Sequence, residues 1–203
     1  GPNGSGKTTL IKAVLGMVIP NKGTISVMGN TIKGNSDYRK KIDYLPQIAN
    51  FPNNLRVKEL IKMIKDLRVG ASDEKSLIEL FQLEPFLNKK LGTLSGGTKQ
   101  KVNIVLTFMF DSPIIILDEP TTGLDPISLI HLKELIQKEK SNGKTIIITS
   151  HIMSFVEEVA DEIVFLLEGT IYFKGSIEAL KKKTDQPDFE HAIASILTTH
   201  THV

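Results

Sequence analysis

The first nine residues, Gly1-Pro-Asn-Gly-Ser-Gly-Lys-Thr-Thr9, have the types and spacing of a phosphate-binding loop, G-x-x-x-x-G-K-[ST]. Glycines let backbone N–H groups approach an anion, and a following helix points its positive dipole end at the same anion. Lys7 is predicted to contact the β- and γ-phosphates, and Thr8 to ligate Mg²⁺. The predicted nucleotide-binding residues of the loop are Gly1, Pro2, Asn3, Gly4, Ser5, Gly6, Lys7, Thr8 and Thr9.

A phosphate loop needs a strand before it and a helix after it, and otherwise the motif is only a glycine-rich turn that precedes a helix. The helix is indicated by apolar residues at helical spacing, which are Leu10, Ile11, Val14 and Leu15. The sequence starts at the first glycine of the loop, so it holds no preceding strand. We therefore expect an N-terminally truncated piece of a longer domain.

Two adjacent acids, Asp118 and Glu119, follow the apolar run Ile114–Leu117. Such a run is typical of a strand buried on both faces of a parallel sheet, whose carboxyl end is where ligands bind. Adjacent carboxylates at a buried strand end are costly unless a cation needs them. We predict that Asp118 holds Mg²⁺ and that Glu119 deprotonates an attacking water. The alternative is a capped turn.

Three further polar sites stand next to predicted strands or helices. Gln47 follows a short strand at Ile42–Leu45. Ser95, with Gly96 and Gly97, opens a helix and offers a second anion-binding turn, or is no more than a helix start. His151 follows a strand at 144–150 that we expect to be buried, and it is placed either to bond a γ-phosphate oxygen, to cap a helix or to lie satisfied in the core.

The remaining pattern predicts how these sites are positioned. Residues 55–94 change to helical periodicity, with a stripe that ends at Leu67 and a second helix capped by Ser72. Asp125 is expected to N-cap a helix that starts at Pro126. Strands at 162–167 and 170–173 form a hairpin that closes the sheet, and helices follow from Ser176 onward.

Composition restricts the function class. The 203 residues are 40% hydrophobic and 24% charged, which fits one sizeable core. The net charge of +2 gives no electrostatic case for nucleic acid, and the absence of cysteine removes thiol and Cys-zinc chemistry. The most apolar stretches are shorter than the roughly 20 residues that span a bilayer, so a membrane role is expected to come from a partner.

The order of these motifs resembles that of the ATP-binding-cassette (ABC) ATPases. The residues that carry the resemblance are Gly1 to Thr9, Gln47, Leu94 to Gly97, Ile114 to Glu119, Thr122 to Asp125, and His151. The resemblance implies an α/β phosphate-loop NTPase with a RecA-like parallel sheet core and an inserted helical subdomain. One departure is Thr98, where the family has glutamine after Leu-Ser-Gly-Gly.

The resemblance also implies roles and partners. Two copies of the cassette would pair head to tail as a homodimer, with each ATP held between the phosphate loop of one copy and the Ser95-Gly96-Gly97 turn of the other. Asp125 is also expected to bind the nucleotide. Gln47 would sense Mg²⁺ and the lytic water, and Glu119 and His151 would complete catalysis. Transmembrane permease subunits, of the export type, would hold the ATPase at the cytoplasmic face of the membrane. No metal other than Mg²⁺ is expected.

One domain is expected over 1–203, with an α/β core at 1–47 and 112–175, a helical subdomain at 48–111 and a C-terminal helical tail at 176–203. The main alternative is a soluble ABC ATPase that acts on DNA or ribosomes, but the interval before the signature is short and free of cysteine. A nucleotide-binding regulator without turnover is disfavoured by the presence of both Glu119 and His151.

Overall fold

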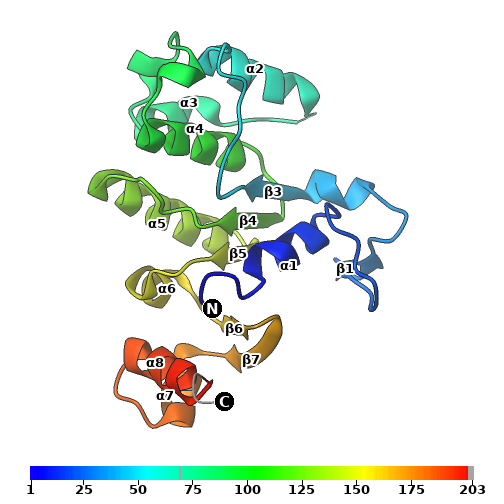
Figure 1. The fold of residues 1–203 in the computed structure, drawn as a ribbon. Helices are drawn as coiled ribbons and strands as arrows, with labels where there is room; N and C mark the ends of the chain where they lie inside the picture. Colours follow the sequence, from blue (N-terminus) through cyan, green and yellow to red (C-terminus); the bar gives the residue numbers. More distant parts are fainter. Residues whose placement is uncertain (69, 201–203) are drawn as a thin grey trace. The chain divides into compact units, whose positions relative to one another are not determined.

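The computed structural model describes residues 1–68 and 70–200, which alternate between helices and strands (Figure 1). The helices are α1 (Lys7–Val14), α2 (Val57–Leu67), α3 (Glu74–Leu80), α4 (Gly96–Phe108), α5 (Pro126–Ser141), α6 (Met153–Val159), α7 (Ile177–Thr184) and α8 (Phe189–His200). Short 3₁₀ helices are η1 (Asp37–Lys41), η2 (Glu84–Phe86) and η3 (Leu91–Thr93). The strands are β1 (Ser26–Val27), β2 (Asn30–Thr31), β3 (Ile42–Leu45), β4 (Ile114–Asp118), β5 (Thr145–Thr149), β6 (Ile163–Leu167) and β7 (Thr170–Gly175).

The chain divides into two compact units. We call Val14–Thr149 the sheet unit, and Gly1–Ala13 together with the chain from Ser150 onward the loop unit. Each unit has its own strands: β1 to β5 belong to the sheet unit, and β6 and β7 belong to the loop unit.

A three-stranded parallel sheet in the order β3-β4-β5 forms the centre of the sheet unit. The middle strand, β4, is buried on both faces, because Ile115, Ile116 and Leu117 are at most 1% exposed. The predicted parallel sheet with a fully buried central strand is therefore confirmed. This arrangement brings the carboxyl ends of all three strands to one edge, since parallel strands end on the same side.

The expectation that the strand before His151 is buried is wrong. Thr145 and Ile147 of β5 are exposed, with Ile147 at 42%. Among the described strands β5 pairs only with β4 and so lies at the edge of this sheet. An apolar β-branched run does not by itself distinguish a central strand from an edge strand.

The predicted helical segment contains α2 and α3 and is followed by α4, and these three helices lie together (Figure 1). Two expected details are wrong. Leu67 is 74% exposed, because α2 ends at that residue and the buried stripe stops at Ile61. Ser72 does not cap α3: the N-cap is Asp73, and the Ser72 hydroxyl instead donates to the Glu74 carboxylate.

In the loop unit, β6 and β7 form the predicted hairpin, with Glu168 and Gly169 both in the left-handed region that a two-residue turn requires. The hairpin does not close the parallel sheet, because its strands pair only with each other among the described residues. Turn chemistry specifies the hairpin but not its lateral partners. The hairpin packs on α7 and α8 in a core of aromatic and aliphatic side chains, which include Phe165, Phe173, Leu180, Phe189 and Ile193.

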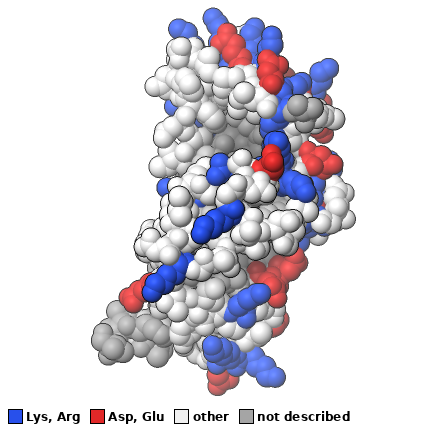
Figure 2. All heavy atoms as spheres, turned by 90° about the vertical axis from the view of Figure 1, so that its right-hand side faces the viewer, with Lys and Arg blue, Asp and Glu red and all other residues white. Residues whose placement is uncertain are grey.

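Within the described part of the chain, the structure has no helix long and apolar enough to cross a bilayer. Acidic and basic side chains are interspersed with uncharged surface on the face drawn in Figure 2. The mixed distribution agrees with the near balance of 25 basic and 23 acidic residues in the sequence.

Candidate functional site: a phosphate loop and a buried acid pair

The phosphate loop leads directly into α1, as predicted, and its glycines meet different needs. Gly4 and Gly6 have φ of +78° and +99°, a backbone conformation that residues with a side chain rarely adopt. Gly1 lies against the hairpin, since a Cβ there would be 2.0 Å from the carbonyl oxygen of Leu166. The Gly169 N–H also donates to the Ser5 carbonyl at 3.0 Å. The loop is therefore held by the β6–β7 turn.

Polar groups of the loop suit a phosphate. The Lys7 ammonium donates to the carbonyls of Gly1 (2.8 Å) and Pro2 (2.9 Å), so its charge lies on the loop itself. The Ser5 hydroxyl is buried and has no hydrogen-bond partner among the described residues. A buried hydroxyl without a partner is costly, and a phosphate oxygen would satisfy it. The loop therefore fits the phosphates of a nucleotide.

The two predicted acids stand at the carboxyl end of β4, where Asp118 is 1% and Glu119 4% exposed. Strand register places Thr149 of β5 opposite Asp118, and the Thr149 hydroxyl donates to the Asp118 carboxylate. The Glu119 N–H donates to both the carbonyl and the hydroxyl oxygen of Thr149, each at 3.1 Å. Thr149 thus contacts the side chain of Asp118 and the backbone of Glu119 at once.

Glu119 has a φ of +50°, in the left-handed region that is uncommon for residues other than glycine. It also precedes Pro120, and the residue before a proline is biased toward extended backbone. Such a conformation persists only where its surroundings fix it, and it occurs preferentially at functional sites.

The strand beside β4 ends close to the same acids. Burial, and secondly the charge of Asp118, raise the pKa of the Tyr44 phenol on β3. Gln47 is exposed two residues beyond the end of this strand. The carbonyl of Pro46, just before it, accepts a hydrogen bond from the Asn103 side chain at 3.3 Å. Gln47 therefore follows a residue whose carbonyl group is fixed by a hydrogen bond from α4.

The Ser95-Gly96-Gly97 turn opens α4 as predicted. Ser95 is the N-cap and its hydroxyl accepts from the Thr98 N–H at 3.2 Å. The two hydroxyls of Ser95 and Thr98 are 2.9 Å apart. Ser95 and Gly96 are exposed, so the turn is accessible to an anion from outside the chain.

Helix α4 also contacts the segment that follows the acids. The buried Gln100 side chain donates to the Pro120 carbonyl at 2.8 Å, and Lys101 pairs with Asp125 at 2.7 Å. Asp125 N-caps α5, as predicted, by accepting from the Ser128 N–H. The hydrogen bond from Lys101, and secondly that from Ser128, hold the pKa of the Asp125 carboxyl well below its usual range.

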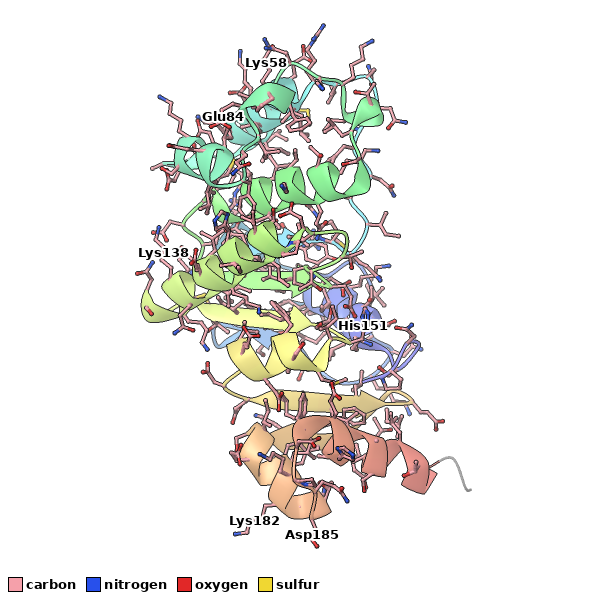
Figure 3. All side chains as sticks on the ribbon, turned by 90° about the vertical axis from the view of Figure 1, so that its left-hand side faces the viewer. Lys58, Glu84, Lys138, His151, Lys182 and Asp185 are labelled. Atoms are coloured by element: carbon pink, nitrogen blue, oxygen red, sulfur yellow. The ribbon has the colours of Figure 1, made fainter. Side chains whose placement is uncertain are left out.

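His151 lies in the segment between β5 and α6 (Figure 3). It is exposed, so the alternative of a satisfied core histidine is wrong. It does not cap a helix either, because the N-cap of α6 is Ile152. The loop unit thus carries Gly1 to Thr9 and His151, and the sheet unit carries Gln47, Ser95 to Gly97, Asp118, Glu119 and Asp125.

Sequence reasoning missed Thr149 and Gln100, whose side chains contact the acids and the segment after them. Thr149 was detectable in principle, because the last residues of adjacent parallel strands come to the same edge. The sequence gives no indication of the Gln100 contact, since a glutamine in the first turns of a helix is ordinary.

A glycine-rich loop that opens a helix and a parallel strand that ends in two buried acids define a phosphate-loop nucleotide-binding α/β protein. The sequence model described as "ABC transporter" matches residues 1–122. The chain belongs to the ABC transporter family, and its fold is that of the family's ATPase cassette.

Curated relatives agree with this family assignment. The Nod factor export ATP-binding protein I of Burkholderia lata is 34% identical over 187 residues, which cover 89% of this chain and 61% of that protein. The ABC transporter ATP-binding protein NatA of Bacillus subtilis is 31% identical, and the match covers 97% of this chain and 83% of NatA. The chain thus spans less than two thirds of the export relative.

Solved structures give the same fold. An ATP-binding subunit of an ABC transporter superposes with a TM-score of 0.90 at 29% identity, covering 97% of this chain and 85% of that one. A dimeric ATP-binding cassette in a post-hydrolysis state, bound to ADP and Pi, superposes with a TM-score of 0.76 at 25% identity, covering 87% and 82%.

Proposed function

We propose that this chain is the ATP-binding and ATP-hydrolysing part of an ABC transporter motor, and that Glu119 is its catalytic base. The observation that carries the proposal is the buried acid pair at the end of β4, with Glu119 in a left-handed conformation fixed by Thr149. A structural strand end has no need of two buried carboxylates, whereas hydrolysis of a nucleotide needs one for a metal ion and one for water.

The donors proposed for Mg²⁺ are oxygen atoms, which is the chemistry a hard cation prefers. Asp118 would hold the ion, with the Thr8 hydroxyl and the Gln47 side-chain oxygen. When bound, the ion neutralises charge on the β- and γ-phosphate oxygens. The buried Ser5 hydroxyl and the N–H groups of the loop would bind phosphate oxygens, and Lys7 would add a point charge.

In the proposed reaction, the Glu119 carboxylate accepts the proton of the water that attacks the γ-phosphorus. The bond between this phosphorus and the β–γ bridging oxygen breaks, which gives ADP and inorganic phosphate. His151 would donate a hydrogen bond to a γ-phosphate oxygen, and Gln47 would orient the water. Each of these side chains lies at or just beyond the carboxyl end of a strand.

We further propose a head-to-tail dimer in which Ser95, Gly96 and Gly97 of one copy, with its Asp125 segment, complete the ATP site of the other. The exposed N-terminus of α4 supports this, because its anion-binding turn is accessible from outside the chain. A structural relative was solved as a dimer with ADP and Pi. Charge balance gives no support to nucleic acid as a partner.

Transmembrane permease subunits are the proposed second partner, with the ATPase held at the cytoplasmic face of the membrane and working in export. The curated export relative supports the direction. In the proposed domain plan, residues 48–111 form the helical subdomain that docks the permease, between core segments at 1–47 and 112–175 and ahead of the tail at 176–203. Exposed apolar side chains at Ile48, Met63 and Leu67 support docking there.

The test uses Glu119→Gln in the whole protein, with Glu84→Gln, an exposed glutamate on η2, as the matched control. Glu119→Gln is expected to bind ATP with wild-type affinity and to lose at least about a hundredfold in kcat, because the base is removed while the shape is kept. Glu84→Gln is expected to match wild type. Hydrolysis by Glu119→Gln within a few-fold of wild type would contradict the proposal.

A further inference from the structure

We infer that Gln100, on the signature helix α4, is a positioning residue for Glu119. Its side-chain amide donates to the carbonyl oxygen of Pro120, the residue after Glu119, at 2.8 Å. Both groups are buried, and Gln100 is 8% exposed. The inference rests on the proposed role of Glu119 as the base.

The backbone around Glu119 is held from two sides. On one side, the Glu119 N–H donates to the carbonyl and hydroxyl oxygens of Thr149. On the other side, the Gln100 amide fixes the orientation of the peptide group between Pro120 and Thr121. A residue at φ +50° before a proline relaxes to extended backbone unless it is fixed in this way. Gln100 therefore keeps the Glu119 carboxylate in its working place.

Two neighbouring contacts link the same helix to the same segment. A Cβ on Gly97 would be 2.5 Å from the Gly123 carbonyl oxygen, and Lys101 pairs with Asp125. The first turns of α4 and the segment 120–125 are thus one packed body. Consequently, a displacement of the signature turn reaches the base through the Gln100–Pro120 hydrogen bond.

The first test compares Gln100→Ala with Gln137→Ala, an exposed glutamine on helix α5, in the whole protein. Steady-state ATP hydrolysis is measured well below the melting temperature of each variant. Gln100→Ala is expected to lower kcat about ten- to a hundredfold with KM for ATP within about twofold of wild type, because misplaced bases lose rate and not substrate binding. Gln137→Ala is expected to match wild type. Unchanged kcat in Gln100→Ala, or kcat and KM that worsen together, would overturn the inference.

A second variant keeps the inference testable if Gln100→Ala does not fold. In Gln100→Glu the introduced carboxyl donates a hydrogen bond to the Pro120 oxygen when protonated and repels that oxygen when ionised. The ratio of its kcat to that of wild type is therefore expected to fall as pH rises through the pKa of this buried group. A ratio that does not change with pH would overturn the inference.

Glu119→Gln, measured in parallel, separates this inference from the proposed function. If Glu119→Gln retains turnover, the base assignment is wrong, and the Gln100 inference falls with it. If Glu119→Gln loses turnover while Gln100→Ala keeps wild-type kcat, only the positioning role of Gln100 is wrong.

Discussion

Gly97 of the signature turn lies directly against the carbonyl oxygen of Gly123, at a separation that leaves no room for a side chain. A Cβ on Gly97 would be 2.5 Å from that oxygen, closer than real Cβ contacts allow. A Cβ on its neighbour Gly96 would meet no atom within 4 Å. Two adjacent glycines therefore differ in what they do: one allows close packing, and the other leaves the turn open.

This difference predicts unequal effects on stability. Gly97→Ala is expected to lower the free energy of unfolding by about 1–3 kcal/mol, because backbone must move away from the new methyl group. Gly96→Ala is expected to leave stability within about 0.5 kcal/mol of wild type. Urea denaturation of both variants measures the difference. Equal stability of the two variants would show that α4 does not pack on Gly123 as described.

Sharing of the ATP site between two copies predicts complementation. Lys7→Ala removes the phosphate-loop charge and Ser95→Arg blocks the signature turn, so either homodimer lacks an intact site. A mixed dimer retains one site with wild-type Lys7 and Ser95. ATPase activity is therefore expected to recover when the two inactive variants are mixed, up to about the activity of one intact site per mixed dimer. Mixed dimers that form but stay inactive would argue against the shared site.

Thr98 stands where the ABC ATPases have glutamine, and its hydroxyl lies 2.9 Å from that of Ser95. Ser95 already accepts a hydrogen bond from the Thr98 N–H, so the side-chain contact adds a second restraint on the Ser95 hydroxyl. Thr98→Val, which keeps the shape without the hydroxyl, is expected to change ATPase rate by about two- to fivefold, the worth of one exposed hydrogen bond. Thr198→Val, on the exposed face of α8, is the control.

A partly buried ion pair joins the end of α2 to the sheet. Arg68 pairs with Asp43 of β3 and donates to the Ser112 hydroxyl at 2.8 Å, and its guanidinium stacks 4.3 Å from the centre of the Phe110 ring. Burial raises the pKa of Asp43 despite this pairing.

Loss of Arg68 is expected to cost more than loss of the Asp43 charge, because Asp43 is 1% exposed at its side chain and Arg68 29%. Arg68→Ala leaves a buried carboxylate unpaired and is expected to lower the free energy of unfolding by about 3 kcal/mol. Asp43→Asn keeps an acceptor for the still hydrated Arg68 and is expected to cost about half of that. Chemical denaturation measures both, with Lys58→Ala on exposed α2 surface as control (Figure 3). The reverse order would contradict this account.

A second pair, Lys65 with Glu74, predicts a dependence of stability on pH. The hydrogen bond from Lys65 lowers the pKa of Glu74 to about 2. A carboxyl whose pKa is lower in the folded state stabilises the protein above its unfolded pKa of 4.5, and that contribution disappears as pH falls toward 2.

Glu74→Gln is therefore expected to lower Tm by about 2–4 °C at pH 7, a loss of about 1 kcal/mol, and by progressively less below pH 4.5. Glu79→Gln, an exposed position on the same helix, is expected to show no such trend. Thermal melts from pH 7 to 3 measure both variants. A Tm difference for Glu74→Gln that is constant over this range would contradict the assignment of the shift to Lys65.

The sequence by itself determined the local features on which chemistry depends. Glycine spacing and the lysine predicted the phosphate loop, the apolar run before Asp118 and Glu119 predicted a buried central strand, and Ser95 and Asp125 were recognised as helix caps. Each of these signals is encoded within about ten residues, because backbone freedom, hydrophobic runs and capping are local properties.

Tertiary structure decided which of these segments meet. The apolar run of β5 predicts more burial than the structure shows, because such a run carries no information on how many strands flank it. The Thr149 contacts to both acids come from strand register, and the Gln100 contact to Pro120 comes from the packing of α4 on a loop twenty residues away. Contacts between residues distant in sequence depend on chain topology and side-chain packing, which no local pattern of residue types encodes.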